Sequence, residues 1–299
     1  MAVKRAWQRV DGVLLLDKPL GLTSNDALQK ARRLFSAAKG GHTGTLDPAA
    51  SGLLPLCFGE ATKFSADLLD ADKTYEAVVQ LGVTTDSGDA EGQVIATAPV
   101  VVDEAAIRAA LPQFTGPIEQ IPPMHSALKH QGRPLYELAR QGITIERQAR
   151  AVTIHALELL NFSGDSFALR VHCSKGTYIR TLAADLGQAL GCGAHLSALR
   201  RTTVGDLNLV HAITLAELET LDEATRSTRL LPVDALLQSL PRIDLDSTAA
   251  ERFTHGNPVD LPPNLVGKIR VYAENHLLGT GQPGPDNRLW PKRLVQSAA

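Results

Sequence analysis

The stretch Gly40-Gly41-His42-Thr43-Gly44-Thr45-Leu46-Asp47-Pro48 concentrates reactive side chains on flexible backbone. Its glycines allow a positive φ or a close approach of the backbone to a ligand. Pro48 disfavours the α region for Asp47 and so restricts how the carboxylate is presented. A carboxylate held in this way can act as a nucleophile or as a general base, and the residues leave both roles open.

Simpler interpretations of this stretch compete with a catalytic one. Asp-Pro is a common turn pair, and a phosphate-binding loop would need the pattern GxxxxGK[ST], which is absent. Thr43-Gly44-Thr45 also resembles part of the phosphorylation loop of cation-pumping ATPases. In those proteins an aspartate occupies the place that Gly41 holds here. The stretch therefore favours a carboxylate-centred site of another kind.

A second polar cluster, Lys175 to Arg180, precedes the clearest helical pattern of the chain. Apolar residues share one face over residues 177 to 190, and Gly191 is placed to end the helix. Arg180 falls in the first turn, where its guanidinium could pair with a carboxylate such as Asp47. A solvated arginine is the simpler alternative.

Two further clusters point more weakly to a binding site. Lys73-Thr74-Tyr75 opens a predicted strand over 74–81, in which Tyr75 could belong to the core or to a site. Basic residues outnumber acidic ones from His125 to Arg150, which indicates either a phosphate-contacting arm or a solvated loop. The basic residues are Lys129, Arg133, Arg140, Arg147 and Arg150, against Glu137 and Glu146.

The rest of the chain alternates between short elements and turns. We expect a long irregular loop over 40–59, an irregular segment over 117–123, and a β-rich domain after a boundary near Leu240. The predicted strands cover 12–16, 74–81, 152–162 and 166–173, and the predicted helices cover 24–35, 104–111, 134–140, 177–190, 215–221 and 233–239.

Charge is distributed unevenly along the 299 residues. The net charge is −2, which counts mildly against nucleic-acid binding. The segment from Ser65 to Glu104 holds nine acidic residues and one basic residue, so it carries −8 and leaves +6 for the remainder. A basic face elsewhere is compatible with this distribution, and so is an acidic solvated loop with no further role.

The cysteines and the N-terminal residues limit the cellular compartment in which we expect the protein. Cys57, Cys173 and Cys192 form no CxxC pair, so neither a disulfide framework nor a zinc site is indicated. The apolar run from Val13 to Leu16 is too short for a signal peptide or a spanning helix. We expect a cytoplasmic protein without membrane contact.

Taken in order, these clusters closely resemble the bacterial TruB family, the tRNA pseudouridine-55 synthases. The resemblance covers nearly the whole chain and is weakest in the C-terminal region, which is similar to a short PUA-type RNA-binding domain. Its motifs are Leu16-Asp17-Lys18-Pro19, Gly41 to Pro48, Gly52 to Pro55, Gly59 to Lys63, Lys73 to Tyr75, Pro122-Pro123, Ser126-Ala127 and Lys175 to Arg180.

The resemblance implies an isomerase that breaks the N1–C1′ bond of one T-loop uridine of tRNA and rejoins the ring through C5. Asp47 falls on the family's catalytic aspartate, Tyr75 on its base-stacking tyrosine and Arg180 on the arginine paired with the aspartate. No metal, nucleotide or redox cofactor is implied. Attack at C1′, addition to C6 and abstraction of a ribose proton all remain open routes for Asp47.

The other matched positions surround the substrate in the family. His42 falls on the histidine that supports the flipped nucleotide, and Tyr178 and Leu199 fall on positions that line the uracil pocket. Lys18 and Pro19 fall on a motif that supports the catalytic loop. These substrate-binding and supporting roles are implied by the resemblance alone.

The implied architecture is an α+β catalytic core over 1–240, built on a mixed, mostly antiparallel sheet with a central cleft. A thumb over about 124–151 would grip RNA, and 241–299 would form a PUA-like domain. We expect a monomer that binds the T-arm of tRNA without an obligate protein partner. Two other hypotheses are an RNA-folding protein on the same scaffold and a hydrolase of small nucleosides that uses Asp47.

Overall fold

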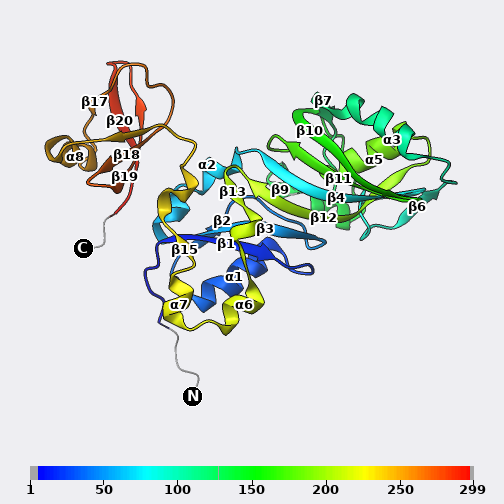
Figure 1. Cartoon of the computed structure of the whole chain (residues 1–299), viewed down its shortest axis with the longest axis horizontal. Helices are drawn as coiled ribbons and strands as arrows, with labels where there is room; N and C mark the ends of the chain where they lie inside the picture. The colour runs from blue at the N-terminus through cyan, green and yellow to red at the C-terminus, as the bar shows by residue number, and fades with distance from the viewer. Residues whose placement is uncertain (1–5, 127, 297–299) are drawn as a thin grey trace.

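Two sheets organise the chain, as Figure 1 shows. The computed structural model describes residues 6–126 and 128–296. Within these residues an 11-stranded sheet forms the long body of the molecule and a 5-stranded sheet forms its C-terminal end. No helix among them is long and apolar enough to cross a membrane.

The large sheet is mixed and mostly antiparallel, as expected. The parallel pairs are β1 with β14 and β12 with β3. The main path runs β14 (Ile213–Thr214), β1 (Gly12–Lys18), β3 (Ala50–Phe58), β12 (Ala194–Val204), β4 (Lys73–Leu81), β11 (Ser166–Cys173), β10 (Arg150–Ser163) and β7 (Gly116–Gln120). Three short strands flank this path, namely β2 (Gly40–His42), β13 (Leu207–Asn208) and β15 (Leu230–Leu231).

Helices cover this sheet in two groups, which bury two apolar clusters side by side. The helices α1 (Ser24–Leu34) and α6 (Leu215–Thr220) pack near β1 and β3, whereas α5 (Ile179–Ala189) and α3 (Glu104–Ala110) pack near β4, β10 and β11 (Figure 1). Tyr75 and Leu199 contact both clusters. These two side chains therefore lie at the boundary where the groups of helices separate.

The remaining helices are short, and two small hairpins complete the core. The helices are η1 (Gly59–Lys63), α2 (Ser65–Leu69), η2 (Leu111–Phe114), α4 (Leu135–Arg140), η3 (Leu209–His211), α7 (Glu223–Ser227) and η4 (Val233–Leu236). The hairpins pair β5 (Val83–Thr85) with β6 (Val94–Thr97) and β8 (Lys129–His130) with β9 (Arg133–Pro134).

Local sequence explains the clearest helices. Thr23 caps α1 through a capping box with Asp26, which satisfies two free N–H groups at the helix start. The predicted helix of residues 177–190 begins two residues later than expected, because Tyr178 is its N-cap in an extended conformation. Gly191 follows with a φ of 80°, as a helix-ending glycine requires.

Two predictions of irregular structure are wrong. Residues 40–42 and 50–58 are strands, so the irregular loop is confined to 43–49. The strand of residues 50–58 pairs with β1 and β12, and the strand of residues 40–42 pairs with that strand in turn. This tertiary pairing outweighs the low strand propensity of glycine and proline. Residues 116–120 likewise form β7, an edge strand in register with β10, where Pro117 is tolerated.

The second sheet begins at Arg242 and encloses its own apolar cluster. It is β-rich, as expected, but it also contains one helix that the sequence analysis did not anticipate. Its elements are β16 (Arg242–Asp244), α8 (Ser247–Thr254), β17 (Val259–Asp260), β18 (Ile269–Ala273), β19 (His276–Pro283) and β20 (Arg288–Leu294). This unit lies at one end of the molecule, beside α2 (Figure 1).

Candidate active site

The loop between β2 and β3 carries Asp47 and is fixed from both sides. The Ser24 hydroxyl, at the start of α1, donates to the Leu46 carbonyl at 3.0 Å and accepts from the Leu46 N–H at 2.8 Å. The Gly21 N–H donates to the Pro48 carbonyl at 2.9 Å. The carboxylate of Asp47 is therefore presented from a loop whose backbone is held immediately before and after it.

Asp47 forms an ion pair with Arg180, as the sequence analysis anticipated. One carboxylate oxygen lies 3.0 Å from the guanidinium, which projects from the first turn of α5. The Asp47 side chain is 46% exposed and the Arg180 side chain is 8% exposed. The arginine thus supports the carboxylate from the protein side and leaves its other face open to a substrate.

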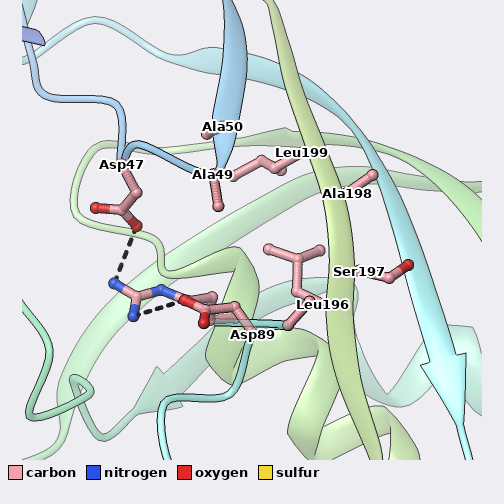
Figure 2. A pocket seen from close by; sticks show the side chains of 10 residues that line it. Asp47, Ala49, Ala50, Asp89, Leu196, Ser197, Ala198 and Leu199 are labelled. Atoms are coloured by element: carbon pink, nitrogen blue, oxygen red, sulfur yellow. Dashed lines mark ion pairs between the residues drawn. The ribbon is translucent and has the colours of Figure 1, made fainter. Parts of the chain in front are cut away.

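Arg180 also binds a second carboxylate, Asp89, at 3.2 Å, and donates to the His125 carbonyl at 2.6 Å. Asp89 itself accepts from the Ser87 hydroxyl at 2.6 Å and from the Glu91 N–H at 3.1 Å. Figure 2 shows both ion pairs, with the guanidinium between the two carboxylates. One cation is therefore shared by a half-exposed carboxylate and a buried one.

Asp89 corrects the interpretation of the acidic segment as a solvated loop with no further role. Thr85, Ser87 and Asp89 are each 7% exposed, so this part of the segment is buried against the site. The sequence carried no signal that separated Asp89 from its exposed neighbour Asp86, because both lie in one turn-rich acidic run.

An apolar wall closes the other side of the hollow beside Asp47 (Figure 2). Leu196 and Leu199 project from β12, Ala49 ends the loop that carries Asp47, and Ala50 begins β3. Leu199 is thus placed in the same hollow as Asp47 and Arg180. Such a surface can accept the faces of a planar, weakly polar ring next to the carboxylate.

Tyr75 lies on β4 near this hollow, half-buried between the two apolar clusters. Burial raises the pKa of its phenol, and the charge of the neighbouring Arg201 partly offsets that rise. The phenol is therefore neutral at physiological pH. A neutral aromatic ring packed against two apolar clusters is suited to stacking on a base.

Tyr178 is held by a buried amide that the sequence analysis did not identify. The Gln120 side chain accepts from the Tyr178 N–H at 3.0 Å and donates to the Tyr178 carbonyl at 3.3 Å. Gln120 is 2% exposed and comes from β7. Burial raises the pKa of the Tyr178 phenol, and the nearby Ser126 hydroxyl lowers it.

Lys18, at the end of β1, supports the turn that touches the loop carrying Asp47. Its ammonium group donates to the carbonyls of Pro19 at 2.9 Å and Leu22 at 2.7 Å. Lys18 is fully buried, and burial lowers its pKa to about 8, while the charge of Asp47 opposes that change. Pro19 therefore acts through its backbone, as an acceptor for this lysine.

His42 lies on β2 and is the least connected of the predicted site residues. Burial lowers the pKa of its imidazole, and the charge of Arg201 lowers it further. Its Nδ1 atom is buried without a hydrogen-bond partner among residues 6–126 and 128–296. The imidazole is thus neutral at physiological pH, which suits contact with a nucleobase.

The geometry and the comparisons together define the class of protein. An aspartate on a fixed loop, a buried arginine and an apolar hollow on a mixed sheet are the features expected of a pseudouridine synthase. The description "TruB family pseudouridylate synthase (N terminal domain)" matches residues 32–179. "tRNA pseudouridylate synthase B C-terminal domain" matches 180–238, and "Pseudouridine synthase II TruB, C-terminal" matches 241–295.

Similar proteins agree over the full length. The tRNA pseudouridine synthase B of Dechloromonas aromatica (strain RCB) is 73% identical over 298 residues, covering 100% of both chains. That of Aromatoleum aromaticum (strain DSM 19018 / LMG 30748 / EbN1) is 60% identical, covering 97% of this chain and 94% of its own. The chain belongs to the TruB family.

Solved structures share the fold. A chain in an H/ACA RNP bound to a substrate RNA containing 2′-deoxyuridine superposes with a TM-score of 0.73 at 25% identity, covering 96% of this chain and 85% of that one. A chain in a Cbf5-Nop10-Gar1 complex superposes with a TM-score of 0.71 at 29% identity, covering 91% and 78%.

Proposed function

We propose that this chain converts the uridine at position 55, in the T-loop of tRNA, to pseudouridine. The observation that carries the proposal is the half-exposed Asp47 carboxylate, ion-paired to the buried Arg180 beside an apolar hollow. The names of the full-length relatives support tRNA as the substrate. The enzyme would be an intramolecular transferase that needs no cofactor.

The proposed reaction begins when the target uridine leaves the folded loop, at a cost of a few kcal/mol. Stacking of the base on Tyr75 returns about 1–3 kcal/mol of that cost. Leu199 and Tyr178 would line the uracil pocket, and His42 would support the displaced nucleotide. Lys18, through the Pro19 carbonyl, would keep the catalytic loop in place.

The chemical step exchanges one bond to C1′ for another. The N1–C1′ bond breaks, the uracil turns and a C5–C1′ bond forms. The C5 hydrogen then leaves to solvent as a proton, and N1 takes up a proton, so the product is an isomer of the substrate. Asp47 stabilises the positive charge that develops at the anomeric carbon, as carboxylates do in glycosidic cleavage. Arg180, ion-paired to Asp47, would keep its carboxylate aimed during this exchange. Attack at C1′, addition to C6 and ribose deprotonation are all compatible with this position.

RNA binding is proposed for two regions outside the hollow. Residues of about 124–151 form the proposed thumb. Its lysine and arginine side chains would contact phosphates of the T-arm. Residues 241–299 form the proposed PUA-like RNA-binding domain, and 1–240 the catalytic domain. The protein would act as a monomer in the cytoplasm.

Tritium release from tRNA labelled at uridine C5 tests the reaction, because only loss of the C5 hydrogen frees the label. We expect wild type to release tritium without added metal or nucleotide. Asp47→Asn should abolish release while tRNA affinity stays within about tenfold, since phosphate contacts dominate binding. Asp165→Asn, which changes an exposed carboxylate in the β10–β11 turn, is the matched control. A fully active Asp47→Asn would refute the proposal.

A further inference from the structure

Arg201 has the largest of the fully buried side chains that the structure describes, and its charge is not balanced by an ion pair there. It is 1% exposed, and no carboxylate lies within ion-pair distance of it in the described part of the chain. Its Nε–H donates to the Leu53 carbonyl at 2.8 Å, and a terminal N–H donates to the Gly44 carbonyl at 3.4 Å. The guanidinium therefore holds backbone on both sides of Asp47.

Strand register places Arg201 between the catalytic loop and Tyr75. On one side β12 runs parallel to β3, with Arg201 opposite Gly52. On the other side β12 runs antiparallel to β4, with Arg201 opposite Tyr75. Directly opposed residues on adjacent strands project to the same face of a sheet. Arg201 is thus in register with the strand that carries the loop and with the proposed stacking residue.

The contact with Gly52 is tight enough to exclude a side chain there. A Cβ atom on Gly52 would lie 2.3 Å from the Arg201 carbonyl oxygen, and the φ of Gly52 is 102°. A shift in β12 pairing between Arg201 and Thr203 adds a bulge at the same point. Bulges of this kind redirect one side chain of a strand. Close backbone contact and the bulge together restrict the backbone of β12 at Arg201.

The charge of Arg201 reaches the other groups of the site. It lowers the pKa values of Lys18 and His42, and it opposes the rise in the pKa of Tyr75. A buried ion without a carboxylate partner is costly, and an apolar residue of similar volume would avoid that cost. Stability alone therefore does not explain an arginine here.

We infer that Arg201 is a positioning residue of this site, which sets the spacing between the Asp47 loop and the ring of Tyr75. The inference rests on the proposed function. Its chemistry is that of a rigid donor fork. The guanidinium holds one carbonyl of the loop and one carbonyl of β3, and it also interacts with the Tyr75 phenol on the adjacent strand. Asp47 reaches the sugar and Tyr75 reaches the base, so a change in their spacing would misalign the two halves of one nucleotide.

Steady-state tritium release with Arg201→Met and Arg201→Lys tests the inference. A misplacement of about 1 Å can cost about 100-fold in rate, so we expect Arg201→Met to lower kcat by about that factor. Its KM should stay within about threefold of wild type, and Arg201→Lys should recover part of the loss. Arg170→Met, which removes a half-exposed arginine on the same sheet, is the control. Unchanged kcat in a folded Arg201→Met would overturn the inference.

Fluorine NMR gives a readout that does not depend on turnover. The chain has four tyrosines, so 3-fluorotyrosine labelling yields few signals and Tyr75→Phe assigns the one of interest. Arg201→Lys should shift the Tyr75 signal and Arg170→Met should not. An unmoved signal in Arg201→Lys would overturn the inference even if Arg201→Met fails to fold. Wild type that releases no tritium would refute the proposed function instead, and the NMR comparison would still stand.

Discussion

At the scale of single residues, the site depends on how one arginine is divided between two carboxylates. Arg180 pairs with Asp47, which faces solvent, and with Asp89, which is buried. A buried guanidinium needs several acceptors, because each unmet donor carries a desolvation cost. Asp89 and the His125 carbonyl supply these acceptors in addition to Asp47. The position of the guanidinium relative to Asp47 therefore depends on both.

Asp89→Asn tests this dependence. The amide keeps the volume of the side chain but loses its charge, so Arg180 loses one of its two ion pairs. Breaking a buried pair typically costs about 3–5 kcal/mol of stability, and we expect kcat for tritium release to fall by about 10–100-fold through misplacement of Asp47. Thermal melting and single-turnover release would measure both. Glu91→Gln, on the exposed neighbour, should match wild type; equal losses in both variants would count against a specific role for Asp89.

The sequence predicted part of this site. The ion pair of Arg180 with Asp47 could be anticipated because a motif-rich loop and a helix start each offered one charged group. The roles of Asp89, Gln120 and Arg201 could not, since each side chain acts through a partner that is distant in sequence and belongs to another element. Gln120 reaches Tyr178 over 58 positions, and Arg201 reaches Leu53 over 148.

At the scale of elements, strand pairing decided what local propensity could not. The predicted strands over 12–16, 74–81, 152–162 and 166–173 all formed, because their residues alternate or are uniformly apolar. β3 was predicted as a loop, since its glycine and proline disfavour a strand. It nevertheless pairs along its length with β1, from Gly52 to Phe58. Loop 43–49 is irregular, and its two ends are fixed by β2 before it and β3 after it.

Lys73 joins two elements and makes stability depend on pH. Its ammonium group donates to carbonyls at the end of α2, including that of Leu69 at 2.8 Å, while burial lowers its pKa from 10.5 to about 8. The unfolded chain thus binds more protons between pH 8 and 10.5, so stability rises with pH across that window. We expect wild type to gain roughly 2–3 kcal/mol there relative to Lys73→Met.

Urea unfolding at several pH values between 8 and 10.5 measures this difference. Lys73→Met should be less stable at every pH, because it leaves carbonyls without a donor. The informative quantity is how the difference in the free energy of unfolding between wild type and Lys73→Met changes with pH. If that difference stays constant, Lys73 binds its proton equally in the folded and unfolded states. The lowered pKa of Lys73 in the folded protein would then be wrong.

At the scale of the whole molecule, the C-terminal unit is docked firmly against the core. Lys268 forms an ion pair with Asp67 of α2 at 2.5 Å, and Lys63 donates to the Leu294 carbonyl at 3.0 Å. Leu277 and Val295 pack against an apolar cluster of the core. Because the docking is both apolar and polar, the C-terminal unit holds a defined orientation to the sheet that carries Asp47.

RNA binding by this unit predicts a salt signature. Trp290 and Lys292 lie two residues apart on β20, and both are exposed. Lys292→Ala should reduce the slope of log Kd against log salt concentration for tRNA by about 1, with kcat at saturating tRNA unchanged. Arg108→Ala, on α3 at the far end of the molecule (Figure 1), is the control. An unchanged slope for Lys292→Ala would place the bound RNA elsewhere.

The position of β12 in the chain also determines when, during synthesis, the site can form. It is the central partner of β3 and β4, yet it follows β4 in the chain by more than a hundred residues. A ribosome adding about 5–20 residues per second needs about 6–25 s to reach its end after β4 is made. Until then the two halves of the sheet have no common strand between them. A nascent chain therefore acquires the hollow beside Asp47 late, because Leu196 and Leu199 of its wall come from β12.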